Sequence, residues 1–194
     1  MPKHGDIDKI LVIGSGPVFL GQAGELDQAS VQACDALRSM GYQLVIAHSD
    51  PAAVITDLPQ KDHVYIEPLD INSLSCIINI ENPDAILALY GGQTALNLIA
   101  DLSESEIFSK NKIRLLDLSS MALNVATDRL QLKALSLPEH ITHSRYTCAD
   151  STTQAISEAE KINYPLVIRS HFQEPGLGNT IAYNVEELRA AVNT

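Results

Sequence analysis

The segment Lys-Ile-Leu-Val-Ile-Gly-Ser-Gly at residues 9–16 indicates the fold of the chain that follows it. A short apolar run that ends in two glycines is typical of a buried strand followed by a tight turn. Over residues 22–40 the apolar positions recur at helical spacing, and Gly41 is a typical residue for ending a helix. This succession of strand, turn and helix predicts the first unit of a parallel α/β sheet.

The alternation of strand and helix continues as far as residue 117. Apolar runs predict further strands at residues 43–50, 63–68, 84–90 and 112–117. Helical spacing of the apolar positions predicts helices at residues 72–82 and 94–103. The fold class that we expect for this part is α/β, a Rossmann-like doubly wound parallel sheet.

Beyond residue 117 the pattern changes. Two short helices are predicted at 119–126 and 128–135, and then a strand-like stretch at 143–150. Ser151 is a suitable N-cap for a helix at 152–162, which is followed by strands at 164–170 and 180–184 and a helix from residue 185. We therefore expect two domains, residues 1–126 and a partial α+β lobe at residues 127–194.

The composition excludes several classes of function. A net charge of −11 repels phosphate backbones, so nucleic-acid binding is not expected. The sequence has no secretory signal and no apolar run long enough to span a membrane, so no membrane partner is expected. The three cysteines, Cys34, Cys76 and Cys148, are scattered, which argues against a disulfide scaffold or a zinc cluster and favours the cytoplasm.

The first candidate for chemistry is the glycine-rich segment 14–21. Glycines between a strand and a helix can approach a phosphate, and Asp50 could imitate the acid that binds a ribose. However, Phe19 occupies the place of the third glycine of a dinucleotide site, and Pro17 removes a backbone donor. A tight turn that lets the helix pack closely is the favoured interpretation.

The second candidate is Gly-Gly-Gln-Thr-Ala-Leu-Asn at residues 91–97, which follows the predicted strand at 84–90. Ligands of open α/β sheets bind at the carboxyl ends of the strands. Gln93 and Asn97 could bond a neighbour there, or the segment could serve only to begin a helix.

The third candidate is Arg169 with the loop at 171–180, which contains Gly176 and Gly178. Glycine amides in such a flap can fold over phosphates, and arginine supplies a fixed positive charge. Arg169 could equally pair with a surface acid, and Arg129 is ambiguous in the same way. The pair His140 and His143 lacks a third ligand at suitable spacing, so no metal site is expected.

Taken together, these segments resemble the large chain of carbamoyl phosphate synthase over nearly the whole length. The stretches that carry the resemblance include KILVIGSGPVFLGQAGELD, SDPAAVITD, PDAILALYGGQTALN, YPLVIRSHF and GNTIAYNVEEL. The resemblance implies a pre-ATP-grasp domain followed by the start of an ATP-grasp domain. It also implies that Arg129, Arg169 and Gly176 bind the phosphates of ATP.

The resemblance further implies the chemistry and the partners. The family is an ATP-dependent ligase that uses ATP with Mg²⁺ to phosphorylate bicarbonate and form carbamate, in arginine and pyrimidine biosynthesis. The partners implied are the remainder of the large chain and a glutaminase small chain. The family's Mg²⁺ ligands lie beyond residue 194, so we expect the 194-residue polypeptide to be inactive alone, and the assignment as an enzyme stays open.

The glycine loop departs from the family pattern. The family has nearly continuous glycine where this chain reads Pro-Gly-Leu-Gly-Asn-Thr at residues 175–180. Pro175 removes a donor, and the added side chains restrict close approach of the backbone. This departure leaves an alternative open, a degenerate, non-catalytic relative that acts as a binding or partner module.

Overall fold

The computed structural model describes residues 3–17, 24–57, 62–103, 105–116, 144–169 and 179–192, the helix at 129–136, and residues 119, 122 and 125. The chain divides into two compact units, Met1–Thr127 and Asp128–Thr194. Each unit is described by itself.

Unit 1 is built on a parallel sheet. Its strands are β1 (Lys9–Ile13), β2 (Gln43–His48), β3 (His63–Ile66), β4 (Ala85–Leu87) and β5 (Arg114–Leu115). Within the described residues they form one five-stranded sheet in the order β3-β2-β1-β4-β5, and all four pairings are parallel. The doubly wound parallel sheet predicted from the sequence is confirmed. The order reverses between β1 and β4, which makes that edge the topological switch point.

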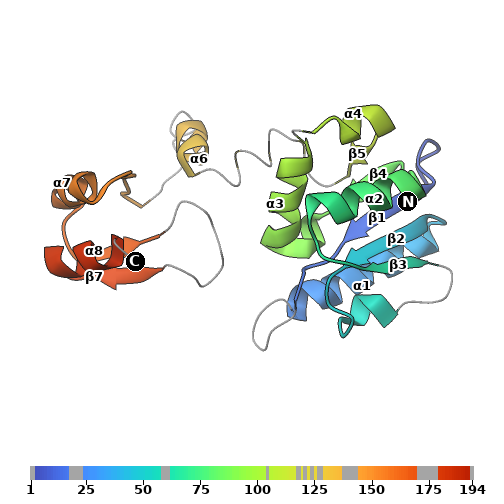
Figure 1. Cartoon of the computed structure of the whole chain (residues 1–194), viewed down its shortest axis with the longest axis horizontal. Helices are drawn as coiled ribbons and strands as arrows, with labels where there is room; N and C mark the ends of the chain where they lie inside the picture. The colour runs from blue at the N-terminus through green and yellow to red at the C-terminus, as the bar shows by residue number, and fades with distance from the viewer. Residues whose placement is uncertain are drawn as a thin grey trace. The chain divides into compact units, whose positions relative to one another are not determined.

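Helices cover both faces of this sheet (Figure 1). They are α1 (Gly24–Ser39), α2 (Ile71–Glu81), α3 (Gly92–Ser103) and the short α4 (Ile107–Asn111), with the 3-10 turns η1 (Val54–Asp57) and η2 (Leu89–Gly91). Leu11 and Ile13 of β1 pack with residues of α2 and α3 on one face. Ile10 and Val12 pack with Cys34 of α1 on the other. Strand β1 is therefore buried on both sides, as its continuous apolar run predicts.

Cys34 is a core residue and not an available thiol. It is fully buried, and burial raises the pKa of its thiol to about 12. Cys76 is exposed, and all three cysteines are free.

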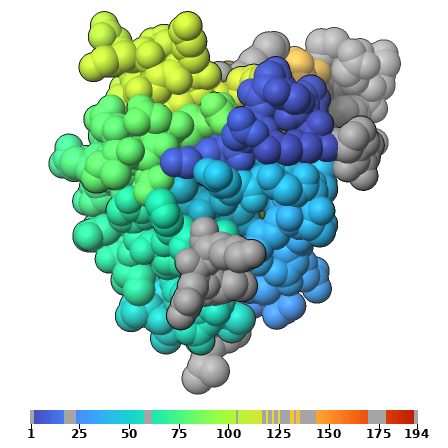
Figure 2. Space-filling view, turned by 90° about the vertical axis from the view of Figure 1, so that its right-hand side faces the viewer, coloured from blue at the N-terminus to red at the C-terminus, as the bar shows by residue number. Residues whose placement is uncertain are grey.

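The N-terminal segment lies against the amino end of the sheet. Figure 2 shows it, in dark blue, between the yellow-green residues around α4 and the lighter blue residues of α1 and β2. The backbone N–H of His4 donates to the Tyr42 hydroxyl at 2.8 Å, and Arg114 donates to the Asp6 carboxylate. These contacts hold residues 4–6 over the start of β2 and the edge strand β5.

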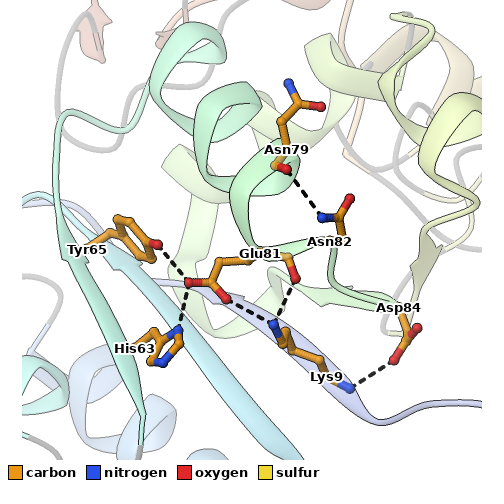
Figure 3. A network of polar contacts seen from close by, with 7 residues as sticks. All are labelled: Lys9, His63, Tyr65, Asn79, Glu81, Asn82 and Asp84. Carbon is orange, nitrogen blue, oxygen red and sulfur yellow. Dashed lines mark hydrogen bonds and ion pairs between the residues drawn. The ribbon is translucent and has the colours of Figure 1, made fainter.

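A buried carboxylate joins several elements at the same end of the sheet (Figure 3). Glu81, at the end of α2, lies 3.0 Å from the Lys9 ammonium, 2.7 Å from the Tyr65 hydroxyl and 2.7 Å from the His63 ring nitrogen. Burial alone would raise the pKa of Glu81, but these three hydrogen bonds outweigh it and lower the pKa to about 2. The network therefore ties α2 to β1 and β3 through one charged group.

Unit 2 pairs helices with a small hairpin. Its elements are α6 (Arg129–Ser136), α7 (Thr152–Ile162), β6 (Leu166–Ile168), β7 (Thr180–Ala182) and α8 (Val185–Val192). The strands are antiparallel, and Val167 is opposite Ile181. The Ser151 hydroxyl accepts from the backbone N–H of Gln154, so the predicted N-cap of α7 is confirmed.

Several sequence predictions need correction. Residues 144–150 form no strand, although the alternating pattern at 143–150 predicted one. This segment lies outside the two-stranded sheet, so tertiary pairing, not local propensity, decided its state. The strand predicted at 84–90 stops at Leu87, and a 3-10 turn takes residues 89–91. The helix predicted at 119–126 lies largely outside the described residues.

Within the described part of the chain, no helix has the length and apolar character needed to cross a membrane.

Replacing Glu81 with Gln tests the network at the amino end of the sheet. The folded-state pKa lies below the ordinary value, so the carboxylate stabilises the fold above about pH 4.5, and this contribution is lost as the pH falls toward 2. We expect Glu81→Gln to lower the free energy of unfolding by about 2–3 kcal/mol at pH 7 and to flatten its acid dependence. Urea denaturation from about pH 7 down to about pH 2, which covers the range over which Glu81 titrates, measures both effects.

The matched control is Glu106→Gln, which changes an exposed residue of the same unit whose side chain makes no capping bond. An unchanged acid dependence in Glu81→Gln would contradict the assigned role.

Candidate functional site

The carboxyl ends of β1 and β2 meet at one edge of the unit 1 sheet. Ile13 is opposite Ala47, and the backbone N–H of Gly14 donates to Ala47 O at 2.9 Å. The register therefore continues one step further, which places Gly14 opposite His48, and Ser15 and Ser49 directly follow this pair. These four residues form the floor of the candidate edge site.

The imidazole of His48 occupies the space that a side chain on Gly14 would need. A Cβ on Gly14 would lie 1.8 Å from His48 Cδ2. The ring is fully buried, and burial lowers the pKa of His48. Its Nδ1 accepts from the backbone N–H of Asp50 at 2.9 Å, so in the neutral ring Nε2 carries the proton. Gly14 thus serves packing, although its neighbour is the His48 ring of β2 and not the following helix that the favoured interpretation named.

The segment at 91–97 is also explained largely by packing. A Cβ on Gly91 would lie 2.6 Å from the carbonyl oxygens of both Ile13 and Gly14. Gln93 Nε2 donates to Asn97 Oδ1 at 2.7 Å, so these two side chains bond each other along α3. Gly91 therefore lets the start of α3 approach the end of β1, and the structural interpretation of the motif is favoured.

A buried carboxylate positions the loop after β2. Asp27 of α1 is 5% exposed and accepts backbone N–H bonds from Val54 at 2.7 Å and Ile55 at 3.1 Å. Asp50 accepts from the backbone N–H of Ala52 at 2.8 Å. Both aspartates therefore hold the turn at 50–57, and Asp50 has a local structural partner besides the ribose role considered for it. Phe19 lies outside the described residues.

In unit 2 the β6–β7 hairpin has one buried and one exposed face. Leu166 and Ile168 pack with the cluster of Ala159, Ala182 and Leu188. The opposite face carries Val167, Ile181 and Tyr183, which are 63%, 52% and 65% exposed. Arg169 directly follows β6, is exposed, and by strand alternation lies on the side of Val167.

Of the three predicted phosphate-binding residues, the structure describes the side chain of Arg169 alone. Arg169 lies at the end of β6, as above. Arg129 is the first residue of α6, and its side chain lies outside the description. Gly176 also lies outside the described residues. Among the described residues no group of three or more His, Cys, Asp or Glu side chains is arranged to hold a metal ion.

Sequence reasoning did not identify His48, Asp27 or the exposed face of the hairpin as notable. The signal for Asp27 was weak, because an acid in the first turn of a helix is common at the surface. The exposed face of the hairpin could have been predicted. Val167 and Ile181 are apolar residues that alternate with core-facing residues, in strands that helices cover on one face.

The fold of the chain matches parts of known carboxylase structures. The fold matches a biotin carboxylase from Campylobacter jejuni, solved as a complex with β,γ-ATP, with a TM-score of 0.68, 18% identity, and coverage of 95% of this chain and 40% of that one. It also matches a pyruvate carboxylase from Rhizobium etli with a TM-score of 0.64, 18% identity, and coverage of 95% and 16%. The chain therefore shares its fold with part of these carboxylases.

Comparison with protein families is more specific. Residues 6–125 match the carbamoyl phosphate synthase preATP-grasp domain, and residues 128–194 match the carbamoyl-phosphate synthase L chain ATP-binding domain. The chain belongs to the carbamoyl phosphate synthase large-chain family.

Two curated relatives illustrate this membership. The chain is 44% identical to the carbamoyl phosphate synthase large chain of Archaeoglobus fulgidus over 97% of its own length and 18% of the relative's. It is 42% identical to that of Pseudothermotoga lettingae over 99% of its own length and 17% of the relative's. The chain thus spans less than a fifth of the length of these relatives.

The contact between Gly14 and His48 can be tested by a double-mutant cycle. Gly14→Ala adds a Cβ that displaces the buried ring, so we expect it to lower the free energy of unfolding by about 2–3 kcal/mol. In the His48→Ala background the space is open, and the same change should cost under about 1 kcal/mol. Equal costs in the two backgrounds would show that the ring does not fill this space.

Proposed function

We propose that this chain is the amino-terminal portion of a carbamoyl phosphate synthase large chain and provides the lobe that binds the phosphates of ATP. Residues 1–126 are the pre-ATP-grasp domain and residues 127–194 the first lobe of the ATP-grasp domain. The observation that carries the proposal is the match of residues 128–194 to the family's ATP-binding domain, in which Arg169 ends a strand with an exposed apolar face.

The hairpin offers the two kinds of contact that a nucleotide needs. Val167 and Ile181 are neighbours in the register and form an exposed apolar surface suited to a flat base. Arg169, on the same side, supplies a guanidinium for the phosphates. The proposal adds Arg129 and the loop containing Gly176 as further phosphate ligands, on the resemblance of the sequence.

In the proposed reaction, this chain, the remainder of the large chain and a glutaminase small chain have separate roles. In this proposal ATP would bind with Mg²⁺, which would supply neutralisation of the phosphate charge during phosphorylation of bicarbonate. The Mg²⁺ ligands come from the remainder of the large chain, and ammonia comes from a glutaminase small chain. The reaction belongs to arginine and pyrimidine biosynthesis in the cytoplasm, and one similar relative is the arginine-specific large chain of Lactiplantibacillus plantarum.

The altered glycine loop favours a second candidate, a non-catalytic module that keeps the fold. Residues 175–180 read Pro-Gly-Leu-Gly-Asn-Thr, and each lost hydrogen bond to phosphate weakens binding by roughly 1.5–3 kcal/mol. Complete absence of ATP binding would favour this candidate over the first.

The role of Arg169 is tested by calorimetric titration of the 194-residue polypeptide with ATP and Mg²⁺. We expect weak binding to the wild-type chain and a loss of about tenfold or more in Arg169→Ala, because a charge-assisted hydrogen bond to phosphate is removed.

Arg189→Ala is the matched control, since Arg189 is an exposed arginine of the same unit on α8 and its removal changes the net charge equally. Equal weakening by the two variants would show a general charge effect and contradict a specific contact at Arg169.

Turnover by the isolated polypeptide gives an independent test. We expect no Mg²⁺-dependent ATP hydrolysis above background, because the proposal assigns the metal ligands to the remainder of the large chain. Hydrolysis that persists in the wild-type chain and is abolished in Arg169→Ala would overturn this division of the reaction.

A further inference from the structure

Two unpaired hydroxyl groups are buried where β1 and β2 end. Ser15 is 7% exposed, Ser49 is partly exposed, and the Oγ atoms of both are buried without a hydrogen-bond partner among the described residues. A buried hydroxyl without a partner costs free energy, so two of them together need an explanation.

Strand alternation indicates on which face of the sheet the two hydroxyls lie. Residues 11 and 13 of β1 and residues 45 and 47 of β2 point to the face covered by α3. Ser15 and Ser49 are each two residues beyond the last of these positions, one step past the pair Gly14 and His48, so alternation favours this face for both. The imidazole of His48 fills the space beside Gly14, which by the same alternation is on the opposite face.

The first turn of α3 closes this corner. A Cβ on Gly16 would lie 3.8 Å from Thr94 Oγ1 and 3.9 Å from Ser49 Oγ, so both hydroxyls lie beside the open side of Gly16. Gly16 has a φ of +77°, which favours glycine and keeps this side free of a side chain. The first backbone N–H groups of a helix have no intrahelical partner, and α3 has 12 residues.

The donors define the class of ligand. Serine and threonine hydroxyls and the N-terminal amides of a helix all donate to a negative oxygen, and the helix dipole favours a negative charge there. These groups are neutral, and Asp27 and Asp50 hold the neighbouring turn. Because the donors are neutral and two carboxylates hold the neighbouring turn, the donors suit a small ion with one negative charge better than a phosphate with two.

We propose that Ser15, Ser49 and the first turn of α3, at Thr94, bind a small singly charged oxyanion at the carboxyl edge of the unit 1 sheet. This site is built from residues of unit 1 alone and does not depend on the function proposed for Arg169.

The test is a titration of the 194-residue polypeptide with sodium formate, with sodium chloride at equal ionic strength as the reference. Amide NMR signals of Gly16 and Thr94 are expected to shift saturably with formate and not with chloride. Ser15→Ala and Ser49→Ala are each expected to weaken the response about tenfold. Without formate, Ser15→Ala is expected to unfold at the same temperature as wild type or higher, because it removes an unpaired buried hydroxyl.

Ser39→Ala is the matched control, since the exposed Ser39 hydroxyl already donates to Ala36 O at 2.7 Å. Its formate response should equal that of the wild type. Three results would each overturn the proposal. The first is the absence of a saturable shift, which is the result expected if an ordered water occupies the serines. The second is an undiminished formate response in both serine variants. The third is tighter binding of inorganic phosphate than of formate.

Discussion

The burial of β1 on both faces is the constraint on which unit 1 depends. Its alternate residues pack against α1 on one side and against α2 and α3 on the other, while β2 and β4 take its backbone hydrogen bonds. Because β1 is covered on both faces and paired on both edges, it fixes the positions of the segments that precede and follow it. The loop at residues 14–16 is therefore held in a single place, and α3 is brought against it through Gly91.

The two ends of the sheet differ in chemistry for a physical reason. At the amino end, the buried Glu81 carboxylate is matched by the Lys9 ammonium and two further donors, so its charge is compensated within the fold. At the carboxyl end the buried Asp27 carboxylate accepts two backbone N–H bonds, whereas the serine hydroxyls have no partner among the described residues. A compensated network stabilises the fold, whereas unmatched donors are capable of recognising a ligand.

In unit 2 the same alternation that forms the core also produces the exposed face. Leu166 and Ile168 point toward α7 and α8, so Val167 must point away from them, and Ile181 is its register partner. A two-stranded hairpin with helices on one side leaves its other side apolar and uncovered. This arrangement puts an exposed apolar surface on the same side as Arg169, and the nucleotide-binding role proposed for this unit rests on that pairing.

The sequence by itself determined the strand–helix alternation of unit 1, the N-cap at Ser151 and the membership of the family, because periodicity, capping and motif order are local properties of the chain. Tertiary structure alone decided that residues 144–150 form no strand and that the buried His48 ring requires Gly14. Those outcomes depend on which segments become neighbours in space, and residues 34 positions apart carry no local signal of such contact.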